Sequence, residues 1–248
     1  MKRLLILLCI SIIAVSCLVY AVNAKPHSIN MESVEYIEPN FYEFNGTVLE
    51  TKERETVTLR PAHYKKVSTD KVLIMGNSLS VGMSYVDDDK YNFIAKNSAT
   101  LKSTRQEGRY EQINDYEFDT VIICFGTNAL YWNLDTWRYE FDILFEEIYK
   151  ANPNADIVIT TPPPVSQEVS DNNKTVNNKN VKRCSQYLKQ IADENDVYYL
   201  DNSRLFGDVL SDDISSDGVH LNSKWYKIWL DFMIEEAGKM ERIVFDDL

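Results

Sequence analysis

The chain has 248 residues, of which 44% are hydrophobic, so it can bury one full core and is too apolar to be disordered. Its formal net charge of −12 argues against a nucleic-acid-binding protein, because phosphate contacts need clustered Lys and Arg. A neutral or small substrate fits this charge better, and we expect no nucleic acid among the partners.

Residues 1–24 have the pattern of a targeting segment, with two basic residues before a long uncharged run. The small residues at 22–24 resemble a signal peptidase site and favour secretion. The length of the run favours an uncleaved membrane anchor almost equally, and residues 14–17 resemble a bacterial lipobox, which is the third alternative. We therefore predict an exported protein, either secreted or anchored on the outer face of the cytoplasmic membrane.

Residues 25–69 are polar and acidic and form a predicted extension, in which residues 47–59 alternate as in a hairpin. From residue 70, short apolar runs alternate with amphipathic segments, and residues 239–248 follow as an acidic tail. The apolar runs predict strands at residues 71–75, 92–95, 120–124, 156–160 and 197–200. The amphipathic segments predict helices at residues 79–85, 136–150, 176–195 and 223–237.

Strands that alternate with helices, each strand apolar nearly throughout, predict a parallel sheet covered on both faces. Residues 70–238 are therefore expected to form one α/β domain. In such a sheet, ligands bind beyond the carboxyl ends of the strands. Chemistry is thus sought in four short segments, at residues 76–78, 96–100, 125–128 and 216–221.

Ser78 follows the first predicted strand in the segment Gly-Asn-Ser. Taken alone, it is more typical of a turn with a helix cap than of a nucleophile. A serine nucleophile needs a base and a third group that orients the base. His220 precedes the last predicted helix, and Asp217 lies three residues before it with Gly218 between them, so the carboxylate can reach Nδ1 while Nε2 faces the serine.

Acyl transfer also needs hydrogen-bond donors for the developing oxyanion. Asn128 offers a side-chain amide at the end of a central strand, and the backbone N–H groups of Ser78 and of the loop after the second strand are further candidates. Tyr131 and Trp132 follow this block and fit a platform for a sugar ring, although packing onto the core is the more common role of such residues.

Two cysteines, Cys124 in a predicted strand and Cys184 in a predicted helix, lie outside the targeting segment. An exported protein can pair two such residues, yet two cysteines are too few for a disulfide scaffold. We expect two buried thiols that act as small hydrophobic side chains. One credible histidine and no cluster at ligand spacing give a metal site little support.

In this order, the blocks GNSLS, GTN and SDGVHL resemble those of the SGNH hydrolases, also called the GDSL esterase and lipase family. The resemblance implies a flavodoxin-like three-layer α/β/α sandwich and ester hydrolysis through an acyl-enzyme, without a cofactor. It implies Ser78 as nucleophile, His220 as base and Asp217 as its orienting group. It also implies an oxyanion hole made by Ser78, Ser98 and Asn128.

Two positions depart from the family pattern. Asn77 stands where the family usually has Asp, beside the nucleophile and near the substrate. Ser98, in the segment NSAT, stands where the family has a glycine that donates its backbone N–H, and Asn97 is one position away. A backbone donor survives this replacement if the backbone angles suit a residue with a side chain.

The sequence predicts a serine esterase that removes acetyl or another short acyl group from a small molecule, a carbohydrate or a cell-wall polymer. It leaves the oligomeric state open and favours a monomer. One alternative is an O-acyltransferase, in which a sugar hydroxyl replaces water. Another is a surface binding module with a relict site, which the departures at Asn77 and Ser98 keep open.

Overall fold

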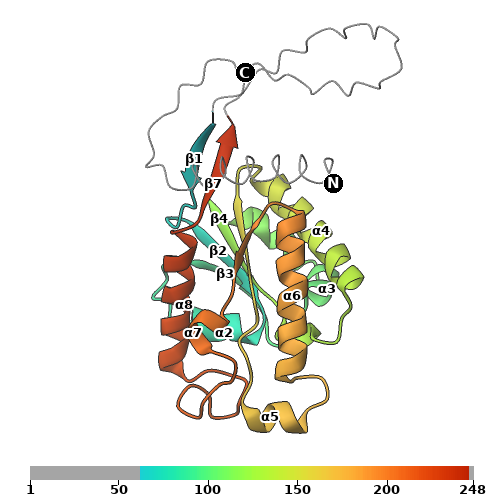
Figure 1. The fold of residues 1–248 in the computed structure, drawn as a ribbon. Helices are drawn as coiled ribbons and strands as arrows, with labels where there is room; N and C mark the ends of the chain where they lie inside the picture. Colours follow the sequence, from blue (N-terminus) through green and yellow to red (C-terminus); the bar gives the residue numbers. More distant parts are fainter. Residues whose placement is uncertain (1–61, 246–248) are drawn as a thin grey trace, which may run out of the picture. The chain divides into compact units, whose positions relative to one another are not determined.

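The computed structural model describes residues 62–245 (Figure 1). The predicted targeting segment 1–24 and hairpin 47–59 lie outside the described residues. Residues 66–242 form one compact unit, slightly longer at each end than the predicted domain. This unit contains the main sheet and all of the predicted site residues.

The main sheet has five parallel strands in the order β3-β2-β4-β5-β6. Three of its strands are buried along their whole length, which explains why most of their residues are apolar. The strands are β2 (Val72–Gly76), β3 (Asn92–Ala95), β4 (Thr120–Cys124), β5 (Asp156–Thr160) and β6 (Tyr198–Leu200). All five were predicted, and the strand order is the flavodoxin-like one, with its switch point between β2 and β4.

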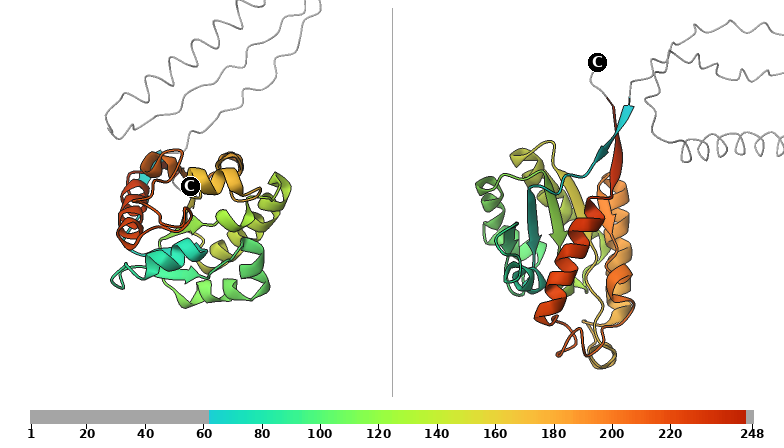
Figure 2. Two further views of the ribbon diagram at one scale, coloured as in Figure 1. Left: turned by 90° about the horizontal axis from the view of Figure 1, so that it is seen from below. Right: turned by 90° about the vertical axis from the view of Figure 1, so that its left-hand side faces the viewer.

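Helices cover both faces of this sheet, as Figure 1 shows and as the views in Figure 2 repeat. One hydrophobic cluster joins one face of the sheet to α3 (Leu101–Gln106), η1 (Arg109–Asp115), α4 (Leu134–Ala151) and α6 (Asn178–Glu194). A second cluster joins the other face to α2 (Ser78–Ser84), α7 (Ser203–Phe206) and α8 (Ser223–Ala237).

Alternate residues of a strand belong to different clusters, as the two-residue period of a strand requires. In β4, Val121 and Ile123 pack in the first cluster, whereas Ile122 and Cys124 pack in the second. The two clusters therefore enclose the sheet between two helix layers, and the predicted three-layer α/β/α fold is confirmed.

The four long predicted helices are present as α2, α4, α6 and α8, but several short elements were not predicted. They are α3, η1, η2 (Thr127–Ala129), α5 (Gln167–Asn172) and α7. Each is too short to show a full apolar period. The predicted acidic tail is also not wholly a tail, because it includes β7 (Glu241–Phe245), which pairs with β1 (Ala62–Lys66) in a separate two-stranded sheet.

The two cysteines of the described part, Cys124 and Cys184, are free and buried, as predicted. Burial raises the pKa of each thiol to about 12. Because the thiolate is the reactive form, both act as small hydrophobic side chains.

The α2–α8 contact depends on Gly82, because a Cβ there would lie 2.3 Å from the ring of Tyr226. Replacing a helical Gly by Ala normally stabilises a helix by about 1 kcal/mol. Here we expect Gly82→Ala to lower the free energy of unfolding by about 1–3 kcal/mol, through overpacking. Urea unfolding measures this, with Gly238→Ala as the control, because a Cβ at Gly238 has no neighbour closer than 3.5 Å. An equal increase in the free energy of unfolding of both variants would contradict the prediction.

Candidate active site

The turn between β2 and α2 separates the helix cap from the serine. Asn77 is the N-cap, and its Oδ1 accepts a hydrogen bond from the backbone N–H of Leu79 at 3.0 Å. Ser78 is the first helical residue. The cap interpretation of Ser78 is therefore wrong, because Asn77 fills that role and leaves the Ser78 hydroxyl available.

The Ser78 hydroxyl lies 3.0 Å from Nε2 of His220, a residue 142 positions away in the chain. The other ring nitrogen, Nδ1, lies 2.8 Å from Oδ2 of Asp217. A carboxylate only accepts hydrogen bonds, so Nδ1 carries the proton, and Nε2 is left to accept from Ser78. The structure thus brings together the three residues that the sequence predicts as a catalytic triad, in the order that proton transfer from serine requires.

The Asp217 carboxylate is also fixed by its own loop. Its Oδ1 accepts from the backbone N–H groups of Val219 at 2.8 Å and His220 at 2.7 Å. Partial burial raises the pKa of Asp217, but the hydrogen bonds from the His220 ring and from these amides outweigh that effect and lower it to about 2. The carboxylate is therefore ionised whenever the imidazole can act as a base.

Residues that the sequence analysis did not identify hold this loop in place. The backbone N–H of Ser166 donates to the Gly218 carbonyl at 2.8 Å, and a Cβ at Gly218 would lie 2.2 Å from the Ser166 hydroxyl. Gly218 has a φ of +76°, which favours glycine. Tyr226 accepts from the backbone N–H of Leu221 at 3.3 Å. The contact of Ser166 with Gly218 joins distant segments, and no local sequence pattern marks it.

The predicted oxyanion residues share one cavity with the triad serine and histidine. This cavity has a volume of about 630 Å³, and Ser78, Asn97, Ser98, Asn128 and His220 line it. The Asn128 side chain, in η2, donates to the Ala99 carbonyl at 3.1 Å, which leaves its second N–H for another acceptor. Asn77, by contrast, is buried and lines no part of this cavity, so the expectation that it contacts substrate is not met.

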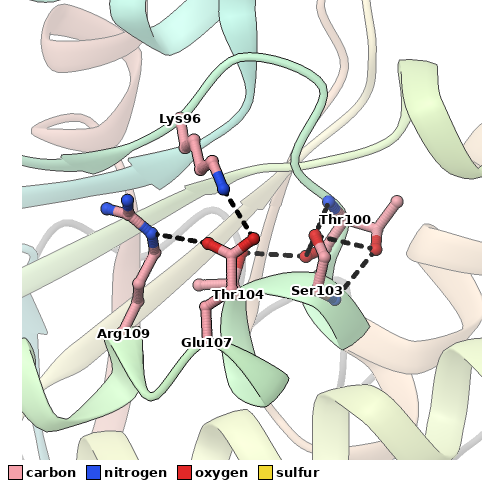
Figure 3. Close-up of polar contacts among 6 residues, drawn as sticks. All are labelled: Lys96, Thr100, Ser103, Thr104, Glu107 and Arg109. Carbon is pink, nitrogen blue, oxygen red and sulfur yellow. Dashed lines mark hydrogen bonds and ion pairs between the residues drawn. The ribbon is translucent and has the colours of Figure 1, made fainter.

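The loop that carries Ser98 is held on both sides by polar contacts, shown in Figure 3. On one side, Lys96 pairs with Glu107 at 2.6 Å, and Glu107 also pairs with Arg109 at 3.0 Å. On the other side, Thr100 and Ser103 form a capping box at the start of α3. The backbone between these contacts is therefore constrained.

Ser98 has a φ of +60°, the left-handed conformation that favours glycine. This agrees with the family resemblance, which places a glycine at this position. A residue with a side chain costs about 1–2 kcal/mol in this conformation, so the serine is tolerated at the expense of strain.

We expect Ser98→Gly to keep esterase activity and Ser98→Val to lose most of it, because a β-branched residue in this conformation forces the loop to move. Steady-state kinetics on an acetyl ester measures the loss of activity. We expect Ser98→Val to change kcat more than KM. Asp196 provides the matched control, since it has a φ of +52° in the turn before β6, at the opposite edge of the sheet. Asp196→Val should lower stability and leave kcat unchanged; equal losses of kcat in both valine variants would refute a local role for Ser98.

The predicted aromatic platform lies beside the site and outside the cavity of Ser78. Trp132 is buried and packs edge-on against Trp137, with ring centroids 4.9 Å apart, so both belong to the core. Tyr131 is 64% exposed. Tyr131 and Trp132 line a second cavity of about 420 Å³, together with Thr100 of the Ser98 loop.

Residues 62–245 contain neither a cluster of metal-binding side chains nor a membrane-spanning helix. No group of three or more His, Cys, Asp and Glu side chains there is arranged to hold a metal ion. No helix in this part of the chain is long and apolar enough to cross a membrane.

Several solved structures share this fold. A GDSL-like lipase from Bacteroides thetaiotaomicron is 17% identical, with a TM-score of 0.52 over 68% of this chain and 89% of the other. A catalytic mutant of an acetylxylan esterase from Geobacillus stearothermophilus is 14% identical, with a TM-score of 0.50 over 68% and 94%. A peptidoglycan O-acetylesterase is 17% identical, with a TM-score of 0.50 over 59% and 45%.

No curated protein matches the sequence. Residues 76–228 match the GDSL-like Lipase/Acylhydrolase family. This match extends from the turn before Ser78 into α8, so it includes all of the blocks on which the resemblance was based. The chain belongs to the GDSL-like lipase/acylhydrolase family and is an SGNH hydrolase.

Proposed function

We propose that this protein is a serine esterase that removes acetyl or another short acyl group from a carbohydrate or a cell-wall polymer. The observation that carries the proposal is the continuous chain of hydrogen bonds from Ser78 Oγ through His220 to Asp217. Such a chain activates a hydroxyl that is otherwise a weak nucleophile.

In the first half of the reaction, Ser78 Oγ attacks the ester carbonyl carbon and its proton moves to Nε2 of His220. The ionised Asp217 stabilises the imidazolium that forms. The oxyanion is stabilised by the backbone N–H groups of Ser78 and Ser98 and by the Asn128 amide. The intermediate collapses, the imidazolium gives its proton to the departing alcohol, and the acyl group remains on Ser78.

In the second half, a water molecule attacks the acyl carbon and His220 Nε2 takes the proton of the water. The second tetrahedral intermediate then expels Ser78 Oγ, which recovers its proton from the imidazolium, and the free acid leaves. Every group returns to its starting state, so the residues present suffice for the cycle.

The substrate class rests on the cavity and on the neighbours with this fold. Four valines, Val81, Val169, Val176 and Val219, offer an apolar wall for an acyl group. Polar residues, among them Asn97, Asn173 and Asn128, offer partners for a hydroxylated alcohol portion. Two neighbours act on acetyl esters of polysaccharides, one on acetylxylan and one on peptidoglycan.

The place of action follows from the predicted targeting segment 1–24. The esterase is exported and acts outside the cytoplasmic membrane, either free or tethered through its N-terminus. Its substrate is then an acylated glycan that is present in the same space.

The departures from the family pattern do not count against catalysis. Asn77 caps α2, a role that asparagine fills as well as aspartate. Ser98 retains a backbone N–H in the glycine-like conformation. A relict binding module is therefore not needed to account for these two residues.

The test is acetate release from p-nitrophenyl acetate and from acetylated xylan by the full chain, with His220→Gln as the inactive comparison. We expect both substrates to be hydrolysed by the parent, with loss of at least about 10³-fold in the variant. Product analysis with an acceptor glycan separates hydrolysis from acyl transfer. A parent that releases no acetate, or a His220→Gln variant as active as the parent, would refute the proposal.

A further inference from the structure

The second cavity lies next to the proposed active site. Thr100 lines it and directly follows Ala99, whose carbonyl accepts the hydrogen bond from Asn128. Tyr131 lines it from the segment that follows η2, the element of Asn128. The segment that contains Ser98 and Thr100 lines both cavities, and so does the segment that contains Asn128 and Tyr131. The hydrogen bond from Asn128 to the Ala99 carbonyl joins these two segments. A polymer with its ester at Ser78 has its neighbouring units close to this second cavity.

One wall of the second cavity is aromatic and rigid. Tyr131 is 64% exposed and meets Trp132 edge to face, with ring centroids 6.4 Å apart. Trp132 is anchored in turn on Trp137, which is fully buried. An exposed tyrosine fixed on buried aromatic rings presents a flat surface at low conformational entropy, as aromatic residues in binding sites do.

Some polar groups of the second cavity already form hydrogen bonds with each other. Thr100 and Ser103 bond one another at the start of α3, as Figure 3 shows. Asn133 Oδ1 accepts from both the backbone and the hydroxyl of Thr136.

Three side-chain donors in this cavity are available. Lys102 Nζ, the Gln106 amide and Asn133 Nδ2 have no hydrogen-bond or ion-pair partner among residues 62–245. The Gln106 amide can both donate and accept, whereas Lys102 only donates and adds a positive charge.

The charge of this lining differs from that of the whole chain. The chain carries 38 acidic and 26 basic residues. The eight residues that line the second cavity include Lys102 and no carboxylate. Lys and amide donors around an aromatic surface fit a sugar ring that bears a carboxylate, since charge-assisted hydrogen bonds to carboxylates are stronger than neutral ones.

We infer that the second cavity is a subsite for a carboxylate-bearing sugar of the polymer whose ester is bound at Ser78. Tyr131 stacks on the ring, and Lys102 binds the carboxylate with help from Gln106 and Asn133. The inference rests on the proposed esterase function and narrows its substrate to acidic glycans. A hexuronic acid carries the required carboxylate, and so does the lactyl ether of a muramic acid to which no stem peptide is attached.

The test compares kcat/KM of the full chain for O-acetylated pectin, O-acetylated peptidoglycan strands freed of their stem peptides, and acetylated xylan, each divided by kcat/KM for p-nitrophenyl acetate. We expect Tyr131→Ala to lower the ratio about tenfold for an acidic polymer, through loss of the stacking surface. Lys102→Met should lower the ratio for an acidic polymer about threefold, which is the effect expected of an exposed ion pair. In the parent this ratio should decrease with added salt, and in Lys102→Met it should not depend on salt. Lys102→Arg should restore the ratio. The polymer with the larger losses identifies the source of the carboxylate.

Matched controls come from the C-terminal end of α4, where Tyr149 and Lys150 are exposed and line neither cavity. Tyr149→Ala and Lys150→Met remove the same groups and should leave every ratio unchanged. Equal losses on neutral xylan and on the acidic polymers, or no loss on either acidic polymer, would overturn the inference.

Binding of unesterified oligogalacturonate and of N-acetylmuramic acid, measured by calorimetry, separates this inference from the esterase proposal. We expect at least one of them to bind the parent and to bind Tyr131→Ala and Lys102→Met more weakly, whether or not esters are cleaved. Failure of both probes to bind the parent would count against the subsite. Failure of p-nitrophenyl acetate hydrolysis alone would count against the esterase.

Discussion

Ser78→Ala is expected to lower kcat/KM for p-nitrophenyl acetate at least about 10⁴-fold, because the variant has no nucleophile and retains only binding and oxyanion stabilisation. The loss should appear in kcat, since the rest of the cavity that receives the ester is unchanged. The donors at Ser98 and Asn128 remain in place in this variant. Some activity above the uncatalysed rate is therefore compatible with the proposal.

The fold should tolerate the Ser78→Ala change. Asn77 rather than Ser78 caps α2, and the Ser78 hydroxyl contacts only His220 among the described side chains. We expect the free energy of unfolding to stay within about 0.5 kcal/mol of the parent. Ser84→Ala, in the same helix, removes a hydroxyl that bonds the Val81 carbonyl and serves as the control with full activity. Similar kcat values for the two variants would contradict the assignment of Ser78.

Asp217→Asn is expected to lower kcat about 10³–10⁴-fold, because a neutral amide no longer fixes the tautomer of His220 or stabilises its charged form. The loop should keep its shape, since the side-chain oxygen of asparagine can still accept from the backbone N–H groups of Val219 and His220. Asp212→Asn removes an exposed carboxylate from the same loop region and should have no effect. Equal activity of the two variants would contradict the role of Asp217.

The same variant has a predictable pH dependence of stability. The pKa of Asp217 is lowered from its ordinary value of 3.8 to about 2 in the folded protein. A lowered carboxyl pKa stabilises the fold above the unfolded pKa, and that stabilisation is lost as the pH falls towards the folded value. The part of the stability difference between the parent and Asp217→Asn that comes from the carboxylate should therefore shrink as the pH falls from about 4 towards about 2. Thermal unfolding at several pH values measures it.

Most of the fold is predictable because the strands are buried on both sides. The sequences of β2, β4 and β5 are apolar at most positions, which predicts both their positions and their parallel pairing. The helix α3 illustrates why short elements were not predicted. The stability of α3 depends on its capping box and on the pairing of Arg105 with Glu140 of α4, a contact that a local pattern does not reveal.

The candidate site shows the same limit. Ser78, Asp217 and His220 could be predicted because their chemistry requires one another. The choice between Asn77 and Ser78 as helix cap could not, because both residue types cap well and the backbone angles decide. The positive φ of Ser98 and the contact of Gly82 with Tyr226 likewise depend on segments that meet only in the fold.

The central claim is that His220 and Asp217 activate Ser78 as a nucleophile. Labelling of the full chain with a fluorophosphonate, followed by peptide mapping, tests it without knowledge of the natural substrate. We predict one adduct on Ser78 in the parent, greatly slowed labelling in His220→Gln and none in Ser78→Ala. A parent that is not labelled, or an adduct that forms equally fast in His220→Gln, would contradict the account.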